Sequence, residues 1–565
     1  MNAPRMPIGI SSFEMLREDG FYYVDKSQFV VEIAESVSAI LLLPRPRRFG
    51  KTLNMTMLQA WYECRPDGSN VTHLFEGLRA ATTEGRHQPR KGKLPVIFLT
   101  FKDIKKSSWE ETRDEVAHLV AAEVRRLSPW FEKANIHEET RLELEALSSG
   151  ESKDALLNQS LKILTESLHI VSGERPLLLI DEYDAPIHAA LTHGFFKEAV
   201  EFFRNFLSAG LKDNKHLWKG VLTGILRVSK ENIFSGLNNI TVNSLAESRF
   251  ETCFGLLESE VETCLRDCGI EFSMDEVRSW YNGYLFGRQT IYNPWSVIRY
   301  ASEPEAGLLP YWVNTASNDI VGTAISNSDN ILRAELEDLL AGGEIEKEID
   351  NYITFEPNSL RPTDVWSFLL FTGYLKLSRP VENREGKLFG FLSIPNREVR
   401  VAFVQLVEKW CRSHFSSSET VKTMLKAFVD GKEEIFERHF SRMVRETLSF
   451  HDVYEEHAES FYHAFVVGLL VNLQGTHTVR SNRESGYGRY DVMLIPKDPI
   501  RQAGVVVEFK TLRKKETPEE ALTAARAQID EKKYVSELQS LGCTRITTWA
   551  IAFRGKEVFM NVQQV

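Results

Sequence analysis

The chain has 565 residues, 43% hydrophobic and 26% charged, an ordinary globular composition that suits three or four domains at roughly 150 residues each. Its formal net charge of −11 argues against a protein that coats nucleic acid through overall attraction, so phosphate contacts must be local. No run reaches the ~18 apolar residues of a membrane span, and we expect a cytoplasmic protein without a membrane anchor. The six cysteines form no C-x-x-C pair, which is typical of free thiols in a reducing compartment.

The stretch RPRRFGKTLNM, residues 45–55, contains half of a phosphate-binding pattern. Gly50, Lys51 and Thr52 match the end of G-x-x-x-x-G-K-[ST], in which backbone N–H groups surround the phosphates, the lysine reaches the terminal ones and the hydroxyl holds magnesium. Arg45 stands where the first glycine belongs. Because Gly-Lys-Thr tripeptides are common, an ordinary basic turn is the alternative interpretation.

The residues on either side favour a phosphate-binding loop. An apolar run at 38–43 precedes it, and residues 52–63 carry apolar side chains at helical spacing after it. A strand, a loop and a helix in this order direct the amides and positive dipole of the helix N-terminus at an anion. The predicted nucleotide-binding residues of the loop are Arg45, Arg47, Arg48, Phe49, Gly50, Lys51 and Thr52.

A second apolar run ends in two acids. Residues 177–180 are typical of a buried parallel strand, and Asp181 and Glu182 follow at its carboxyl end, where ligands bind in open α/β sheets. We expect Asp181 to bind magnesium and Glu182 to be the general base, although the pair also suits a simple strand cap. Thr223, at the end of another predicted strand, and Arg227 beyond it are candidates for contacting the terminal phosphate, and each also suits a structural role.

Alternating strands and helices extend this pattern. Predicted strands at 94–101 and 218–226 are separated by amphipathic segments at 110–128, 153–170 and 195–212. This order predicts an α/β domain built on a parallel sheet.

A different constellation lies near the C-terminus. Residues 484–515 contain two apolar strands, with Asp491 on the first and Glu508 and Lys510 closing the second. Carboxylates at adjacent strand ends bind a hard divalent cation through oxygen, and a lysine two residues after the second acid projects to the same face. Lys510 would orient or deprotonate the attacking water and stabilise the developing phosphoryl charge, whereas a solvated strand end is the alternative.

Polar groups around these strands complete the predicted metal site. Glu459 and His463 are four residues apart on a predicted helix, so they share one face, and Glu459 is the expected third metal-binding acid. A turn before the Asp491 strand and a predicted helix at 517–534 add further polar side chains. The expected supporting residues are His463, Glu484, Gln528 and Tyr534.

Seven segments of the chain point to a known family: YVDKSQF (23–29), RPRRFGKTLNM (45–55), LLLIDEYDAP (177–186), FSGLNNI (234–240), WYNGYLFG (280–287), IYNPWSV (291–297) and YWVNTASN (311–318). Together they closely resemble the bacterial AAA-ATPase-like family. Its members typically join an N-terminal P-loop ATPase to a C-terminal PD-(D/E)XK nuclease-like domain, and the resemblance covers nearly the whole chain. An arginine commonly opens the loop in that family, so Arg45 fits the family pattern. At the C-terminus, Tyr490 replaces the proline of the name, and Lys532 breaks the Q-x-x-x-Y pattern of some relatives.

The resemblance implies a three-part α/β protein: a P-loop NTPase parallel-sheet domain at 1–240, a helical lid and connector at 241–440, and a restriction-endonuclease-like domain at 441–565. It implies ATP and Mg²⁺ as cofactors and nucleic acid as the partner, with DNA favoured over RNA. ATP would gate a magnesium-dependent cut, with defence against mobile DNA as a biological setting and a homo-oligomer as an open option. The alternative is a regulatory or scaffold ATPase whose C-terminal domain binds nucleic acid or protein without cutting.

Overall fold

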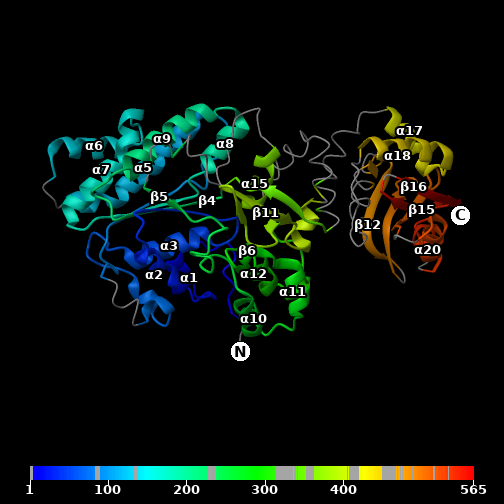
Figure 1. The fold of residues 1–565 in the computed structure, drawn as a ribbon, viewed down its shortest axis with the longest axis horizontal. Coiled ribbons are helices and arrows are strands. Elements are labelled where there is room, and N and C mark those ends of the chain that lie inside the picture. Colours follow the sequence, from blue (N-terminus) through cyan, green and yellow to red (C-terminus); the bar gives the residue numbers. More distant parts are fainter. Residues whose placement is uncertain are drawn as a thin grey trace. The chain divides into compact units, whose positions relative to one another are not determined.

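In the computed structural model the chain forms two units (Figure 1), one of Met1–Ala316 with Glu346–Glu398, the other of Ser317–Ile345 with Val399–Val565. The structure describes residues 4–82, 89–132, 136–225, 233–234, 237, 239–312, 335, 339, 342–350, 362–403, 405, 419–447, 466, 469–470, 473, 475–485, 488–512, 516–531, 534–555 and 557–565.

A five-stranded parallel sheet is the centre of the first unit, which confirms the predicted fold class. Its order is β2-β3-β4-β1-β5. The strands β1, β3 and β4 are buried along their whole length, as expected for a parallel sheet covered on both faces. The bounds are β1 (Ile40–Pro44), β2 (Val96–Thr100), β3 (Leu177–Asp181), β4 (Lys219–Gly224) and β5 (Ile240–Val242).

Helices cover both faces of this sheet. Figure 1 shows α5, α6, α7 and α9 on one side and α1, α2 and α3 on the other. The helix α9 presents a row of aromatic rings, and Phe202 and Phe206 stack at 5.8 Å between centroids. The bounds are α1 (Phe13–Glu18), α2 (Gln28–Glu35), α3 (Lys51–Tyr62), α5 (Trp109–Glu132), α6 (Glu138–Ser149), α7 (Asp154–Ser172), α8 (Ala185–His193) and α9 (Phe196–Leu211).

The middle of the chain contributes mixed structure, whereas we expected helices. Residues 241–316 and 346–398 belong to the first unit, and short strands alternate there with helices. One small sheet has the order β10-β11-β8, with β9 paired to β11, and β6 pairs with β7. The bounds are α10 (Glu258–Asp267), α11 (Met274–Tyr281), β6 (Tyr284–Phe286), β7 (Gln289–Ile291), α12 (Pro294–Ser302), β8 (Ile345–Glu348), α15 (Pro362–Thr372), β9 (Lys376–Leu377), β10 (Glu382–Arg384) and β11 (Lys387–Ser393).

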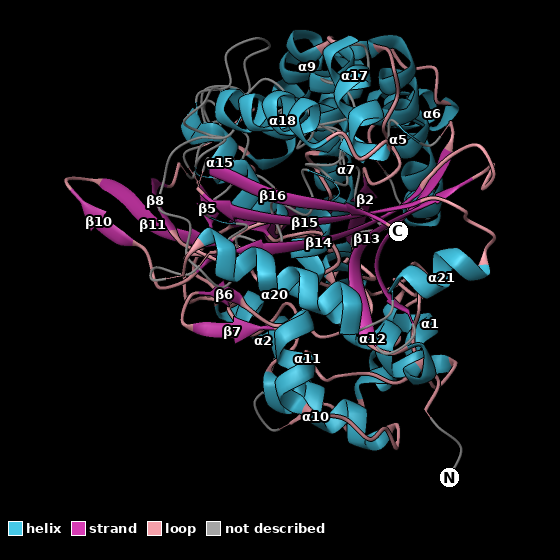
Figure 2. Ribbon diagram, turned by 90° about the vertical axis from the view of Figure 1, so that its right-hand side faces the viewer, coloured by secondary structure: helices cyan, strands magenta, loops and turns pink. Residues whose placement is uncertain are grey.

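The second unit is built on a five-stranded sheet of order β12-β13-β14-β15-β16, in which only β14 and β15 run parallel. Helices lie on both of its faces (Figure 2). Trp549 of β15 stacks on Phe428 of α17, whereas the neighbouring Thr548 accepts a hydrogen bond from Arg526 of α20, because successive strand residues face opposite sides. The bounds are β12 (His477–Ser485), β13 (Gly488–Pro496), β14 (Gly504–Thr511), β15 (Ile546–Arg554), β16 (Glu557–Gln564), α17 (Glu419–Val429), α18 (Glu433–Thr447), α20 (Pro518–Glu531) and α21 (Tyr534–Ser540).

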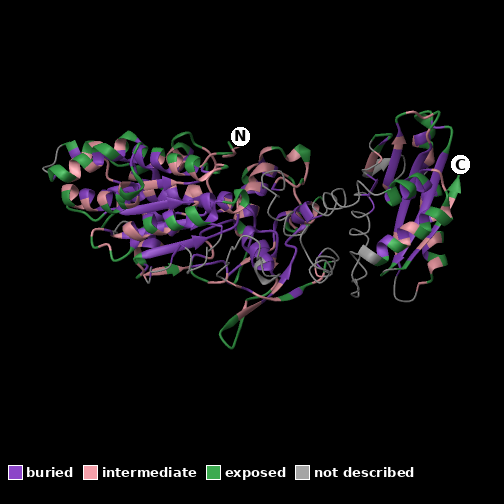
Figure 3. Cartoon of the chain, turned by 90° about the horizontal axis from the view of Figure 1, so that it is seen from above, coloured by how far each residue is buried: buried purple, intermediate pink, exposed green. Residues whose placement is uncertain are grey.

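Buried residues follow the strands of both large sheets (Figure 3). Each unit therefore has its own core, and polar side chains at the strand ends are held in place by rigid neighbours. Among the helices that the structure describes, none is long and apolar enough to cross a membrane.

Candidate functional site

The phosphate-binding loop joins β1 to α3, as the sequence predicted. Gly50 caps the start of α3 with φ of 79°, a left-handed conformation that glycine adopts without a steric penalty. Arg48 also has a positive φ, of 69°, which is costly for a residue with a Cβ atom. The loop therefore turns sharply and presents the N-terminus of α3 at the carboxyl end of the parallel sheet.

Lys51 is buried inside this turn. Its Nζ donates hydrogen bonds to the carbonyl oxygens of Arg45 at 3.1 Å and Pro46 at 3.0 Å. Burial lowers the pKa of Lys51, while the nearby carboxylates of Glu182 and Asp181 oppose that shift. The loop's own carbonyls thus occupy the position in which a phosphate oxygen would accept from the ammonium group.

Asp181 is the centre of a buried network of hydroxyl groups. Its Oδ2 accepts from Thr52 Oγ1 at 2.7 Å and from Thr100 Oγ1 at 3.3 Å, and its Oδ1 accepts from Thr223 Oγ1 at 2.7 Å. Two predicted residues, Thr52 of α3 and Thr223 of β4, therefore meet at the carboxylate of a third, Asp181 of β3. Oxygen donors of this kind are those that Mg²⁺ prefers, so the set from Thr52 and Asp181 fits that ion.

Sequence reasoning missed two residues of this network. Thr100 ends β2 directly beside Asp181 in the parallel register, a position that the strand prediction already placed near the acid. Asp184 is buried, and its Oδ2 accepts from the backbone N–H of Ile225 at 2.8 Å and contacts His188 Nε2 at 3.2 Å. The carboxyl ends of β3 and β4 are thereby fixed to each other.

Glu182 lies beside these groups and is partly exposed to solvent. Its φ of 49° places it in the left-handed region, at the turn that follows β3. Its charge acts on both Lys51 and Arg48. Glu182 therefore faces the loop, as a general base requires, whereas Arg227 is outside the described residues.

Arg45 does not have the role that the sequence suggested. Its guanidinium is fully buried and donates to the carbonyl oxygens of Pro44, Asn243 and Phe250, at 2.8, 2.7 and 3.4 Å. It also lies over the ring of Phe254, 5.1 Å from the centroid. Burial lowers the pKa of Arg45 to about 10. The expectation that Arg45 binds an anion is corrected: the side chain ties the base of the loop to the chain behind it.

The other loop residues point in different directions. The buried ring of Phe49 meets Tyr284 edge-on at 4.9 Å and thus attaches the loop to β6. Arg47 is partly exposed, and Arg48 is exposed with its guanidinium over Trp295. These two arginines remain the candidates for contacting phosphate.

The second candidate site lies where β13 and β14 pair. Val492 is opposite Val507 in the antiparallel register, so Asp491 and Glu508 occupy the next positions on neighbouring strands. Asp491 Oδ2 accepts from the backbone N–H of Phe509 at 2.8 Å, and Glu508 is buried. The two predicted carboxylates are therefore side by side and held by the sheet.

Lys510 links this pair to α20. Its Nζ is 3.2 Å from Glu508 Oε1 and donates to Gln528 Oε1 at 2.9 Å. Burial raises the pKa of Tyr534, and a side-chain hydrogen bond between Tyr534 and Gln528 opposes the shift. The lysine, glutamine and tyrosine predicted from sequence thus form one cluster, although α20 ends before Tyr534.

The rest of the predicted metal site is not described by the structure. Glu459 and His463 lie outside the described residues, and Glu484 is placed in β12 without a described side chain. Within the described part of the chain, no three His, Cys, Asp or Glu side chains gather as a metal site. The donor set of Asp491 and Glu508 fits a divalent cation in kind, and Glu459 stays a prediction.

Comparison with known proteins assigns both segments. Residues 7–234 match the family model "Predicted AAA-ATPase", and residues 457–563 match the model of the PD-(D/E)XK nuclease superfamily. The chain therefore combines a segment similar to predicted AAA-ATPases with a segment similar to the PD-(D/E)XK nuclease superfamily. The loop network falls in the AAA-ATPase segment, and Asp491, Glu508 and Lys510 fall in the nuclease segment.

One relative is a protein of Azotobacter chroococcum mcd 1 described as an uncharacterized protein in the vnfD 5′ region. It is 29% identical over 322 residues, which cover 56% of this chain and 55% of the relative. The match therefore spans about half the length of each protein. Domains of the two matched kinds generally use a nucleotide and a divalent metal, and the nuclease domain suggests contact with nucleic acid.

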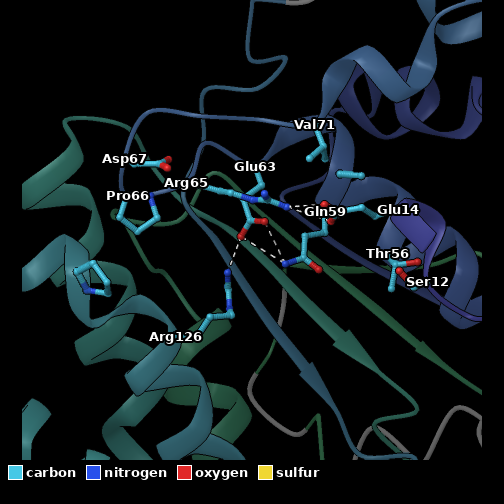
Figure 4. A pocket seen from close by; sticks show the side chains of 12 residues that line it. Ser12, Glu14, Thr56, Gln59, Glu63, Arg65, Pro66, Asp67, Val71 and Arg126 are labelled. Carbon is cyan, nitrogen blue, oxygen red and sulfur yellow. Dashed lines mark hydrogen bonds and ion pairs between the residues drawn. The ribbon is translucent and has the colours of Figure 1, made fainter. Parts of the chain in front are cut away.

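A cavity of ≈ 540 Å³ lies at the other end of α3 from the loop (Figure 4). Glu63 at its wall accepts from Arg126 at 2.6 Å and from Gln59, and Arg65 pairs with Glu14 at 2.8 Å. Glu63 and Arg126, and Arg65 and Glu14, are thus paired across its wall. The cavity is separate from the phosphate loop, since α3 begins at Lys51 and ends at Tyr62.

Proposed function

We propose that this chain binds and hydrolyses ATP at the loop of residues 45–52, and that the nucleotide state gates Mg²⁺-dependent cleavage of nucleic acid at Asp491, Glu508 and Lys510. The observation that carries the proposal is the meeting of Thr52 and Thr223 at the Asp181 carboxylate, beside buried Lys51. A simple basic turn has no need of such a network.

Each residue of the proposed ATPase site has a distinct role. Lys51 exchanges its two carbonyl acceptors for phosphate oxygens, and the amides at the start of α3 face the same anion. Thr52 and Asp181 would hold Mg²⁺, which supplies positive charge to the phosphates. Glu182 accepts a proton from the attacking water, and Thr223 keeps the Asp181 carboxylate in its orientation.

The proposed nuclease site uses fewer groups. Asp491 and Glu508 would hold the divalent cation, which would supply charge that stabilises the attacked phosphodiester. Lys510 orients the attacking water, and its ammonium group is itself positioned by Gln528. Tyr534 in turn holds Gln528, so both act as positioning residues.

The ATPase half is tested with Glu182→Gln. Loss of a general base should slow turnover by roughly 10² or more while ATP remains bound. ATP hydrolysis is measured in steady state and affinity by calorimetry, with wild type as the reference. Normal turnover in Glu182→Gln would remove Glu182 from the proposed role.

The nuclease half is tested by incubating the full chain with labelled single-stranded DNA, double-stranded DNA and RNA. Each substrate is given Mg²⁺ with and without ATP, and EDTA serves as the control. We expect cleavage of DNA in preference to RNA. Binding without cleavage under every condition would favour a different function.

That second function is a nucleotide-dependent regulatory or scaffold ATPase whose C-terminal domain binds nucleic acid or protein. It is favoured by the lack of a three-ligand metal cluster among the residues that the structure describes. Under our proposal, Glu459 supplies the third acid. Location in the cytoplasm, a homo-oligomeric state and a role in defence against mobile DNA are further parts of the proposal.

A further inference from the structure

The side chain of Arg48 rests on an aromatic ring outside the loop. The guanidinium carbon is 4.4 Å from the ring centroid of Trp295, in the first turn of α12. Partial burial lowers the pKa of Arg48, and the charge of Glu182 opposes this shift. Because Arg48 also has a positive φ, the contact with Trp295 helps to hold a strained part of the loop.

Two hydrogen bonds also hold Trp295 in place. Its indole Nε1 donates to the carbonyl oxygen of Tyr311 at 3.3 Å, and its backbone N–H donates to the side chain of Asn293 at 2.9 Å. The ring is therefore attached both to the cap of α12 and to the segment around residue 311.

The next residue continues this connection. Ser296 Oγ donates to the buried carboxylate of Glu398 at 2.8 Å, and the same carboxylate accepts from the backbone N–H of Trp312 at 2.7 Å. The first unit ends at Ala316 and, after its second segment, at Glu398. The start of α12 is thus connected to the loop and to residues that lie close in sequence to both places where the chain leaves the unit.

We propose that Trp295 is a positioning residue of the nucleotide site. Its ring holds the Arg48 guanidinium by stacking and releases it when Arg48 bonds to a bound polyphosphate. Release of the stacked guanidinium changes the first turn of α12, and with it the contacts of Tyr311 and Glu398. This inference rests on the proposed ATP-binding function and adds how occupancy of that site is sensed.

The relative strength of the two interactions decides the direction of the change. An exposed guanidinium stack on tryptophan is weak, whereas a guanidinium bonded to phosphate makes charge-assisted and often bidentate hydrogen bonds. Arg48 is two residues before Gly50, so it belongs to the turn that surrounds the phosphates. A bound polyphosphate should therefore displace Trp295 as the partner of the Arg48 guanidinium.

The first test records tryptophan emission of the full chain during titration with Mg²⁺–ADP and Mg²⁺–ATP. The chain has ten tryptophans, so the Trp295 contribution is the difference between wild type and Trp295→Phe. We expect nucleotide to change that difference. The matched control is Trp218→Phe. The guanidinium carbon of Arg90 likewise lies over the Trp218 ring, 5.0 Å from its centroid, but Trp218 directly precedes β4, at the end of the sheet opposite to the loop.

The second test is a double-mutant cycle on nucleotide affinity, measured by calorimetry. Trp295→Ala should tighten binding of Mg²⁺–ATP about 2- to 5-fold, equivalent to about 0.4–1 kcal/mol, because the competing ring is gone. Arg48→Ala should weaken binding about tenfold, and Trp295→Ala should have no further effect in that background. Trp295→Phe keeps an aromatic ring and should restore most of the wild-type affinity.

The outcomes separate this inference from the function on which it rests. If wild type binds no nucleotide, the proposed ATPase function and the Trp295 role both fail. If nucleotide binds but the Trp295 emission stays constant, or if Trp295→Ala changes affinity equally with and without Arg48, the role of Trp295 alone fails.

Discussion

The two candidate sites hold their acids in different ways. Asp181 accepts hydrogen bonds from neutral threonine hydroxyls, whereas Glu508 is paired with the charged Lys510. A cation that joins Asp181 displaces no positive charge, but a cation that joins Glu508 approaches the lysine already there. We therefore propose that the first site is prepared for magnesium in advance, and that the second requires a higher metal concentration or a negatively charged substrate.

The largest expected effect is at the second site. Asp491→Asn and Glu508→Gln should reduce Mg²⁺-dependent cleavage to background, because a phosphodiester is already negative and its attack needs the cation that these acids hold. ATP hydrolysis should be unchanged in both variants. Gel assays of labelled DNA and steady-state ATPase rates provide the measurement.

Cleavage that survives in both variants would place the metal elsewhere. Loss of ATP hydrolysis in either variant would contradict the separation of the two sites, provided that thermal unfolding shows both proteins to be folded.

The next effect compares two buried lysines at opposite ends of the parallel sheet, Lys51 at the start of α3 and Lys219 at the start of β4. Lys51→Met should abolish nucleotide binding measured by calorimetry, because it removes the ammonium group inside the loop. Lys219→Met is the matched control, since Lys219 Nζ also donates to two carbonyl oxygens, of Ser36 and Ser38, but at the amino end of β4. Nucleotide affinity that falls equally in both variants would mean that the loss reflects the fold.

A smaller effect separates structural from ligand-binding arginines. Arg45→Met should lower the free energy of unfolding by about 2 kcal/mol or more, because it removes the buried, charged hydrogen bonds that the guanidinium donates to three carbonyl oxygens. Arg48→Met should change it by only about 0.5 kcal/mol or less, since the side chain is exposed. Chemical denaturation provides the measurement, and equal losses in the two variants would refute the distinction.

A further effect on stability concerns pH. Burial raises the pKa of Glu398 to about 7, against the hydrogen bonds it accepts from Trp312 and Ser296. A carboxyl group with a raised folded-state pKa binds its proton more tightly when folded, so its stability contribution is complete below the unfolded pKa of about 4.3 and is lost as pH rises through about 7.

The loss is on the order of 3 kcal/mol. The thermal stability of the first unit should therefore decrease from pH 5 to pH 8, and the decrease should be larger in wild type than in Glu398→Gln. Parallel pH profiles in the two proteins would show that Glu398 is not the responsible group.

The sequence predicted what depends on local pattern. Continuous apolar runs identified β1, β2, β3 and β4, and the residues that follow such strands meet at one edge of a parallel sheet, so Thr52, Asp181 and Thr223 could be grouped before the structure was known. Gln528 and Tyr534 were also grouped correctly around Lys510. In each case, strand ends or one helix bring the residues together.

Contacts between distant segments could not be predicted in this way. The burial of Arg45 depends on carbonyl oxygens about 200 positions later, and no local pattern indicates that they lie beneath the loop. The same reason applies to Phe49 on Tyr284 and to Arg48 on Trp295. Aromatic residues of the middle of the chain, Tyr284 and Trp295, thus contact the loop.

The most direct test of the account measures the cleavage rate of labelled DNA in Mg²⁺ as a function of ATP concentration, for wild type and Lys51→Met. We predict that ATP changes the rate in wild type and has no effect in Lys51→Met, whose metal site is intact. A wild-type rate that is the same with and without ATP, or an equal ATP response in Lys51→Met, would contradict gating by the nucleotide site.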